Sequence, residues 1–137
     1  MDANEEYLFK EEGYQLMAAA FDVYNELGAG FLKEVYHEAL ALEFTARGIP
    51  FVSKPRLQIR FKGRFLQKYY DADFLVHSGV AVELKAVRTL APEHEAQLLN
   101  ELKAAQLRVG YLVNFGSSPR LQWARRVDSS APIISAY

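Results

Sequence analysis

The sequence predicts a mixed α/β domain in which helices flank a four-stranded sheet, with the element order α-α-β-β-β-α-β. Three observations support this class. Apolar residues recur at helical spacing in the first part of the chain, the pattern then changes to alternation, and a further helical stretch separates the last two strand-like segments. A helix that connects two strands of one sheet implies that those strands run parallel. We therefore expect the last strand to lie parallel to the third.

Three helices are expected from the spacing of apolar residues. The first covers residues 13–27 and the second residues 31–47. They are followed by Gly28 and Gly48, as is common at helix C-termini. The third covers residues 92–105 and begins with proline, which suits the first position of a helix because its missing N–H would be unpaired there.

Four strands are expected between and after these helices. In the first, apolar and polar residues alternate, which indicates a half-buried strand that ends at a Lys62-Gly63 turn. The third is largely apolar, as expected of a central strand. The predicted strands are residues 56–61, 64–76, 80–87 and 109–115.

The composition indicates one globular domain and excludes several chemistries. The chain has 137 residues, which we divide into a polar leader (1–12), a single domain (13–126) and a tail (127–137). It contains no Cys, which excludes disulfides, thiol nucleophiles and Cys-ligated metal centres. No apolar run approaches the roughly 20 residues of a membrane span, and the acidic start is unlike a signal peptide. We expect a cytoplasmic protein with no membrane partner.

Charge is distributed unevenly although the formal net charge is only −1. One segment, residues 54–68, carries six basic side chains and no acid, which fits either a solvated hairpin with edge-protecting charges or a patch that binds phosphates. The candidate nucleic-acid-binding residues are Lys54, Arg56, Arg60, Lys62, Arg64 and Lys68.

Acidic residues near the centre of the chain form the candidate site. If residues 77–79 make a three-residue hairpin loop with Gly79 left-handed, Asp73 lies opposite Glu83, and Asp71 lies opposite Lys85. A two-residue turn would instead place Asp73 opposite a leucine, so the cluster depends on one step of register.

Two adjacent carboxylates repel each other unless a cation lies between them. A hard, oxygen-ligated ion such as Mg²⁺ or Mn²⁺ would satisfy Asp73 and Glu83, with Lys85 placed to orient an attacking water. The alternative is a structural ladder of ion pairs, in which Asp71 pairs with Lys85 and Glu83 with an arginine.

Five segments carry a resemblance to a known family: residues 30–36, 72–76, 82–87, 94–100 and 112–116. Together they resemble the GxxExxY protein family, which is placed in the PD-(D/E)XK nuclease superfamily. The resemblance implies a nuclease-like core of a helix, three strands, a helix and a strand, which agrees with the predicted order. It also implies an Mg²⁺- or Mn²⁺-dependent nuclease that hydrolyses DNA or RNA.

The resemblance assigns roles to individual residues of this chain. Asp73 and Glu83 match the metal-binding carboxylates, and the backbone carbonyl of Leu84 is a further expected ligand. Lys85 matches the catalytic lysine. Gln97 matches a glutamine on the helix that borders the site in related nucleases.

The sequence departs from the family pattern at two positions. Lys33 stands where the family name implies glutamate, and Glu101 stands where tyrosine is frequent. Lys33 shares a helical stripe with apolar residues that could face the core and the site, whereas the neighbouring Glu34, a candidate metal ligand, shares a stripe that faces solvent. These departures support an alternative function, a catalytically degenerate nuclease fold that binds nucleic acid or a protein partner without cleavage.

A third hypothesis is a homo-oligomer whose interface is an aromatic patch of Tyr69, Tyr70 and Trp123. The competing interpretation places these aromatic side chains in the core, where such residues more often lie.

Overall fold

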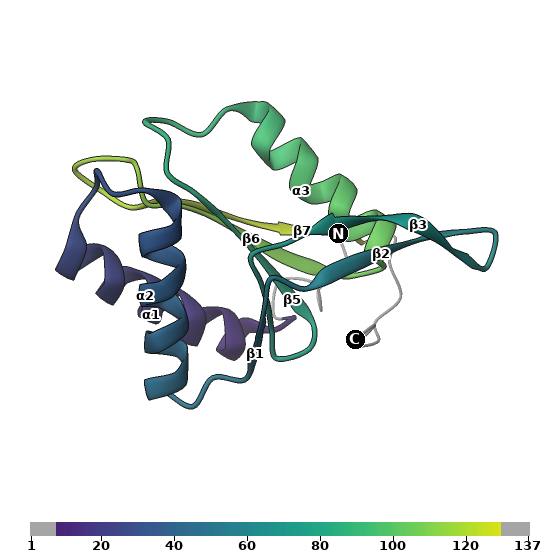
Figure 1. Cartoon of the computed structure of the whole chain (residues 1–137), viewed down its shortest axis with the longest axis horizontal. Coiled ribbons are helices and arrows are strands. Elements are labelled where there is room, and N and C mark those ends of the chain that lie inside the picture. Colours follow the sequence, from purple (N-terminus) through teal and green to yellow (C-terminus); the bar gives the residue numbers. More distant parts are fainter. Residues whose placement is uncertain (1–7, 130–137) are drawn as a thin grey trace.

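A five-stranded mixed sheet lies between two helical layers in the computed structural model, which describes residues 8–129 (Figure 1). The helices are α1 (Lys10–Leu27), α2 (Lys33–Ala46) and α3 (Pro92–Ala105). The strands are β1 (Phe51–Ser53), β2 (Arg56–Phe61), β3 (Arg64–Asp71), β4 (Phe74–Val76), β5 (Val80–Lys85), β6 (Val109–Asn114) and β7 (Gln122–Val127).

The sheet has the strand order β1-β4-β5-β6-β7, and β2 pairs only with β3 in a separate hairpin. The β5–β6 pair is parallel because α3 carries the chain from one end of the sheet back to the other, and the other neighbours are antiparallel. The predicted parallel relation between the third strand and the last predicted strand is therefore confirmed, as is the mixed α/β class.

Each face of the sheet is covered by a different apolar cluster. On one face, α1 and α2 contribute Leu16, Leu40 and Phe44, which pack against the side chains of β4, β5 and β6 that point the same way. On the other face, α3 contributes Leu98 and Leu102. Successive residues of a strand point to opposite faces, so β5 faces the first cluster with Val80, Val82 and Leu84 and α3 with Ala81, Glu83 and Lys85.

The sheet differs from the predicted one in its membership. The strand expected at residues 64–76 divides into β3 and β4, and β3 leaves the sheet with β2 as a hairpin that projects from the body (Figure 1). Phe61, expected on a buried strand face, is 59% exposed because the hairpin extends beyond the layer that would cover it. Two short edge strands, β1 and β7, were not predicted.

The loop between β4 and β5 has the predicted length but a different conformation. Val76 pairs with Val80, as a three-residue loop requires. The left-handed residues are His77 (φ 53°) and Ser78 (φ 59°), and not Gly79 as predicted. A Cβ at Gly79 would lie 2.4 Å from the ring of Phe9, so close packing explains this glycine.

The expected leader and tail overlap the ends of the described residues. α1 begins at Lys10, inside the segment 1–12, and β7 ends at Val127. Residues 1–7 and 130–137 lie outside the described residues. Within residues 8–129, no helix is both long enough and apolar enough to cross a bilayer.

Tyr36 fixes the connection between α1 and α2. Its hydroxyl donates to the Gly28 carbonyl at 2.6 Å and accepts from the Phe31 N–H at 3.1 Å. Its ring is buried and stacks on Phe115 with the centroids 4.7 Å apart. The start of α2, and with it Lys33, is therefore held in a defined place.

We expect Tyr36→Phe to lower the free energy of unfolding by about 0.5–1.5 kcal/mol, because the partly buried Gly28 carbonyl and the Phe31 N–H lose their partner. Urea unfolding followed by circular dichroism measures the change. Tyr14→Phe is the matched control, since Tyr14 is 74% exposed. Equal stability of the two variants would contradict this role of the hydroxyl.

Candidate active site

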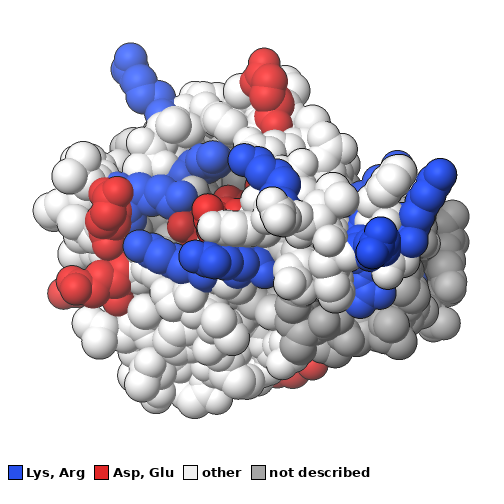
Figure 2. All heavy atoms as spheres, turned by 45° about the vertical axis from the view of Figure 1, so that its right-hand side comes forward, with Lys and Arg blue, Asp and Glu red and all other residues white. Residues whose placement is uncertain are grey.

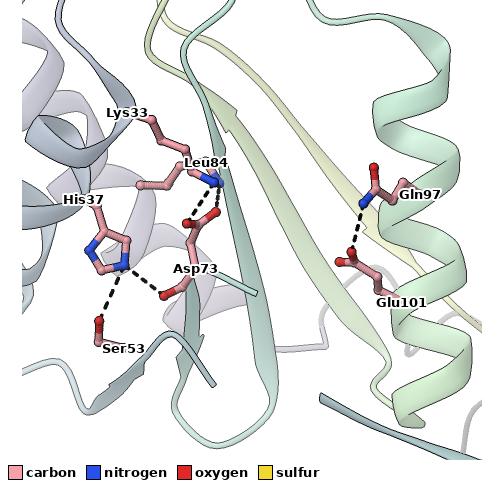
Figure 3. A network of polar contacts seen from close by, with 7 residues as sticks. All are labelled: Lys33, His37, Ser53, Asp73, Leu84, Gln97 and Glu101. Carbon is pink, nitrogen blue, oxygen red and sulfur yellow. Dashed lines mark hydrogen bonds and ion pairs between the residues drawn. The ribbon is translucent and has the colours of Figure 1, made fainter. Parts of the chain in front are cut away.

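Asp73 lies where β3 separates from the sheet. The β4–β5 register pairs Phe74 with Val82 and, continued by one residue, brings Asp73 opposite Glu83. One step further, Ala72 would face Leu84, but the Ala72 N–H bonds instead to the Pro55 carbonyl. The Leu84 N–H then donates to Asp73 Oδ2 at 2.8 Å (Figure 3). The carboxylate thus supplies the acceptor that the departing backbone no longer provides.

The second oxygen of Asp73 carries an ion pair. Lys33 Nζ, from the first turn of α2, lies 3.0 Å from Asp73 Oδ1 (Figure 3). Asp73 is 7% exposed, whereas the Lys33 side chain is 40% exposed. The Asp73 backbone carbonyl accepts from the Lys54 N–H at 2.8 Å and lies 3.1 Å from His37 Nε2. The predicted stripe of α2 therefore does face the site.

Glu83 is buried and faces α3. Burial raises the pKa of its carboxyl from 4.5 to about 9, with further contributions from the negative charges of Glu101 and Asp73, while Lys33 acts in the opposite direction. Glu83 Oε1 has no hydrogen-bond partner. The raised pKa favours the protonated form of Glu83 when no cation is bound.

Glu101 completes a buried carboxyl pair with Glu83. Burial raises the pKa of Glu101, and hydrogen bonds from Glu83 and Gln97 lower it. Gln97 Nε2 lies 3.3 Å from Glu101 Oε1 (Figure 3), and Glu101 Oε2 has no partner. A hydrogen bond between two carboxyl groups requires a proton on one of them, so Glu83 and Glu101 share at least one proton.

Gln97 of α3 and Lys85 of β5 line the same gap. This gap between β5 and α3 is narrow and closed, and His94, Glu83 and Glu101 also line it. The Lys85 side chain is partly exposed and that of Gln97 is exposed. His94 Nδ1 accepts from the Ala91 N–H at 3.0 Å and so caps the start of α3. This contact gives His94 a structural role.

An open hollow of about 530 Å³ adjoins Asp73 on the α2 side. Figure 2 shows red atoms at the floor of a hollow that blue side chains surround. Glu34 lines this open hollow, but its side chain is exposed. The hollow's lining also includes Lys33, His37, Ser53, Lys54 and Asp73.

The predicted pairing of Asp71 with Lys85 is wrong. Asp71 ends β3, where its register partner is Arg56 of β2, and Lys85 instead lies beside Asn114 of β6. The strand bends away from the sheet at Ala72, so the pairing that holds for Asp73 and Glu83 does not continue to Asp71. Leu84 forms a hydrogen bond with Asp73 through its N–H group. Its carbonyl, the predicted metal ligand, takes no part in this bond.

All six candidate nucleic-acid-binding residues are exposed, five of them on the β2–β3 hairpin and Lys54 just before it. Aromatic rings hold three of the cations close to the hairpin. The distances from the cation to the ring centroid are 4.7 Å for Arg56 over Tyr69, 4.9 Å for Arg60 over Phe65 and 5.5 Å for Lys62 over Phe61. We call this surface the basic hairpin.

The three aromatic residues proposed as an oligomer interface do not form one patch. Tyr70 packs against the apolar cluster on the α3 side of the sheet. Trp123 is 43% exposed and stacks on Tyr111, which belongs to the cluster on the opposite side. Tyr70 and Trp123 therefore lie on opposite sides of the sheet.

The sequence did not reveal a network of hydrogen bonds centred on the Asn114 side chain. Asn114 is fully buried at the end of β6, and its Oδ1 accepts from the Val87 and Gly116 N–H groups. Its Nδ2 donates to Gln122 Oε1, which also accepts from the Leu90 N–H. These bonds fix the segment between Lys85 and α3. The signal in the sequence is a polar residue at the end of an otherwise apolar strand.

The described part of the chain contains no group of three or more His, Asp or Glu side chains arranged to hold a metal ion. Asp73 and Glu83 lie close enough for their charges to interact, but Asp73 pairs with Lys33 of α2, whereas Glu83 bonds to Glu101 of α3. The site therefore has two acids of the predicted type, each engaged with other protein groups.

Comparisons with known proteins identify the family. The model of the PD-(D/E)XK nuclease superfamily matches residues 10–127. A search of curated proteins found no significant match. Among solved structures, the fold is similar to the crystal structure of SSO0001, with a TM-score of 0.56 and 16% identity over 89% of this chain and 60% of that one. The family match spans nearly all of the described residues and the fold agrees with it, so the chain belongs to the PD-(D/E)XK nuclease superfamily.

Proposed function

We propose that the protein is a divalent-metal-dependent nuclease that hydrolyses phosphodiester bonds of DNA or RNA. The observation that carries the proposal is the position of Asp73, Glu83 and Lys85 around the end of β5, within a chain of this superfamily. We further propose membership of the GxxExxY family, in which Gly30 (φ 115°) and Tyr36 form the start of α2 and Lys33 is a departure.

The donor atoms near Asp73 suit a hard cation. Carboxylate and carbonyl oxygens are the ligands that Mg²⁺ and Mn²⁺ prefer. Glu83 Oε1 is a buried oxygen without a hydrogen-bond partner, and Glu83 lies beside two other acids whose charge a cation would offset. We therefore assign Asp73, Glu83 and the Leu84 carbonyl as metal ligands, with Glu34 as an outer candidate at the rim of the open hollow.

The protein groups have separate roles in the proposed reaction. A bound divalent ion supplies an activated water and offsets negative charge on the phosphate. The Lys85 ammonium is placed to orient that water or to stabilise charge that develops at phosphorus. Gln97 lies beside it and holds Glu101 through a hydrogen bond, which keeps the polar edge of α3 in place.

We propose that the basic hairpin contacts the phosphate backbone of the substrate. Its cations are exposed and its segment contains no acid, so the local field is positive although the whole chain is nearly neutral. The exposed rings of Phe61 and Phe65 lie among these cations, and such rings offer surfaces on which unpaired bases stack.

A second function, nucleic-acid binding without cleavage, is favoured by one specific observation. The Lys33 ammonium, and no acid from α2, lies against Asp73. A chain in which this pair is permanent would retain the fold and the basic hairpin but lack the metal.

We expect Asp73→Asn and Lys85→Ala to reduce cleavage by about 100-fold or more, because each removes a group assigned to the reaction. The assay follows supercoiled plasmid and labelled single strands in Mg²⁺ and in Mn²⁺. Lys103→Ala, at an exposed position near the end of α3, is the control. A Lys85→Ala protein with full activity would contradict the assigned role, and binding without any cleavage by the wild type would favour the second function.

We expect the double substitution Lys62→Ala and Arg64→Ala to weaken nucleic-acid binding and to reduce the slope of log affinity against log salt by about 1.4–1.8, since each lost phosphate contact removes about 0.7–0.9. Fluorescence anisotropy over a salt series measures both quantities. The control pair is Lys103→Ala with Arg120→Ala, two exposed cations outside the basic hairpin. Equal slopes in the two double variants would show that the basic hairpin does not contact phosphates.

We expect the metal-free protein to lose stability as pH rises from about 5 to about 9. The unfolded Glu83 ionises near 4.5, whereas the folded one keeps its proton up to about 9, so the folded state is favoured most below this window. Glu83→Gln should flatten the dependence and gain about 1–3 kcal/mol over the wild type near pH 8. Thermal unfolding in EDTA measures it, with the exposed Glu34→Gln as control. A wild-type profile that Glu83→Gln leaves unchanged would contradict the buried proton.

A further inference from the structure

Lys33 occupies a place that its helix determines. The loop before α2 is pinned by Tyr36, and the stripe of α2 that contains Lys33 continues with the buried Leu40 and Phe44. Lys33 therefore points toward Asp73, while its neighbour Glu34 points toward solvent. The ion pair follows from the packing of the helix and does not depend on a chance orientation of a long side chain.

The two acids of the site differ in how their oxygens are satisfied. Asp73 Oδ2 accepts from the Leu84 N–H, and Asp73 Oδ1 accepts from the Lys33 ammonium. Glu83 Oε1 has no hydrogen-bond partner. Asp73 Oδ1 is thus already matched by a positive charge from the chain itself.

An ammonium and a divalent ion do not share one carboxylate oxygen readily. Mg²⁺ binds a carboxylate oxygen at about 2.0–2.1 Å, and a cation 3.0 Å from the same oxygen would lie close enough to repel it strongly. The Lys33 side chain is 40% exposed and borders a hollow of about 530 Å³, so it has room to turn toward solvent.

We propose that Lys33 is a resident cation that competes with the divalent ion for Asp73, so that metal binding requires the Lys33 ammonium to leave. The inference rests on the metal site of the proposed function. Lys33, which departs from the family pattern, would then be the residue that sets the affinity of the site for metal. The wild-type chain would then bind metal weakly, and its response to metal concentration would depend on this one side chain.

The test is calorimetric titration of the full chain with Mn²⁺, which reads metal binding without any need for cleavage. We expect Lys33→Met to bind Mn²⁺ at least tenfold more tightly than the wild type and Lys33→Glu to bind more tightly still, because it adds a carboxylate facing Asp73. Lys33→Arg keeps the charge and should bind as weakly as the wild type. Lys54→Met removes another cation from the lining of the same hollow and should change the affinity less than threefold.

Metal-free unfolding gives a second readout. Lys33→Met leaves the buried Asp73 carboxylate without its cation, so its melting temperature in EDTA should fall below that of the wild type, and Mn²⁺ should raise it by more than it raises that of the wild type. In a protein that already carries Asp73→Asn, adding Lys33→Met should neither lower the melting temperature in EDTA nor increase the effect of Mn²⁺.

The outcomes separate the two proposals. Equal Mn²⁺ affinity of the wild type and Lys33→Met would overturn the competition while leaving the metal site in place. An equal rise in Mn²⁺ affinity for Lys33→Met and Lys54→Met would also overturn it, because the rise would then come from the loss of any nearby positive charge. If no variant, Lys33→Glu included, binds Mn²⁺ at millimolar concentration, the metal site of the proposed function fails together with this inference.

Discussion

The hydrogen bond from the Leu84 N–H to Asp73 Oδ2 holds the point at which the chain leaves the central sheet. β4 pairs with β5 over only three residues before Ala72 turns to Pro55. A buried N–H without an acceptor would cost about 1–3 kcal/mol, so the divergence needs a replacement acceptor at this place. Asp73 provides it, and the hairpin, the sheet and the candidate site therefore meet at one side chain.

The structure balances two neighbouring acids in different ways. Asp73 is matched by an N–H group and an ammonium, whereas Glu83 is buried, shares a hydrogen bond with Glu101 and has a raised pKa. Each arrangement sets a different barrier to an incoming cation. On the α2 side an ammonium has to move, and on the α3 side a proton has to leave. The α3 side depends on pH, because the pKa of the Glu83 carboxyl is raised.

Part of this arrangement was predictable from the sequence. The pairing of Asp73 with Glu83 follows from loop length and strand alternation, and helix periodicity orients Lys33 toward the site. The Asp71 pairing failed because periodicity does not reveal where a strand bends out of a sheet. The ion pair of Lys33 was missed because it depends on how α2 docks over the end of β5, which is a tertiary contact. The short strand β7 was missed because its arginines hide the alternation.

The basic hairpin and the site belong to one nearly continuous run of chain. Only Ala72 and Asp73 separate β3 from β4, and the turn at Lys62 and Gly63 lies about ten residues away, or about 30 Å along an extended strand. The base of the basic hairpin is anchored by Leu57, which is fully buried against α3. Because the hairpin is anchored at its base, its exposed cations lie at set distances along the chain from the acids.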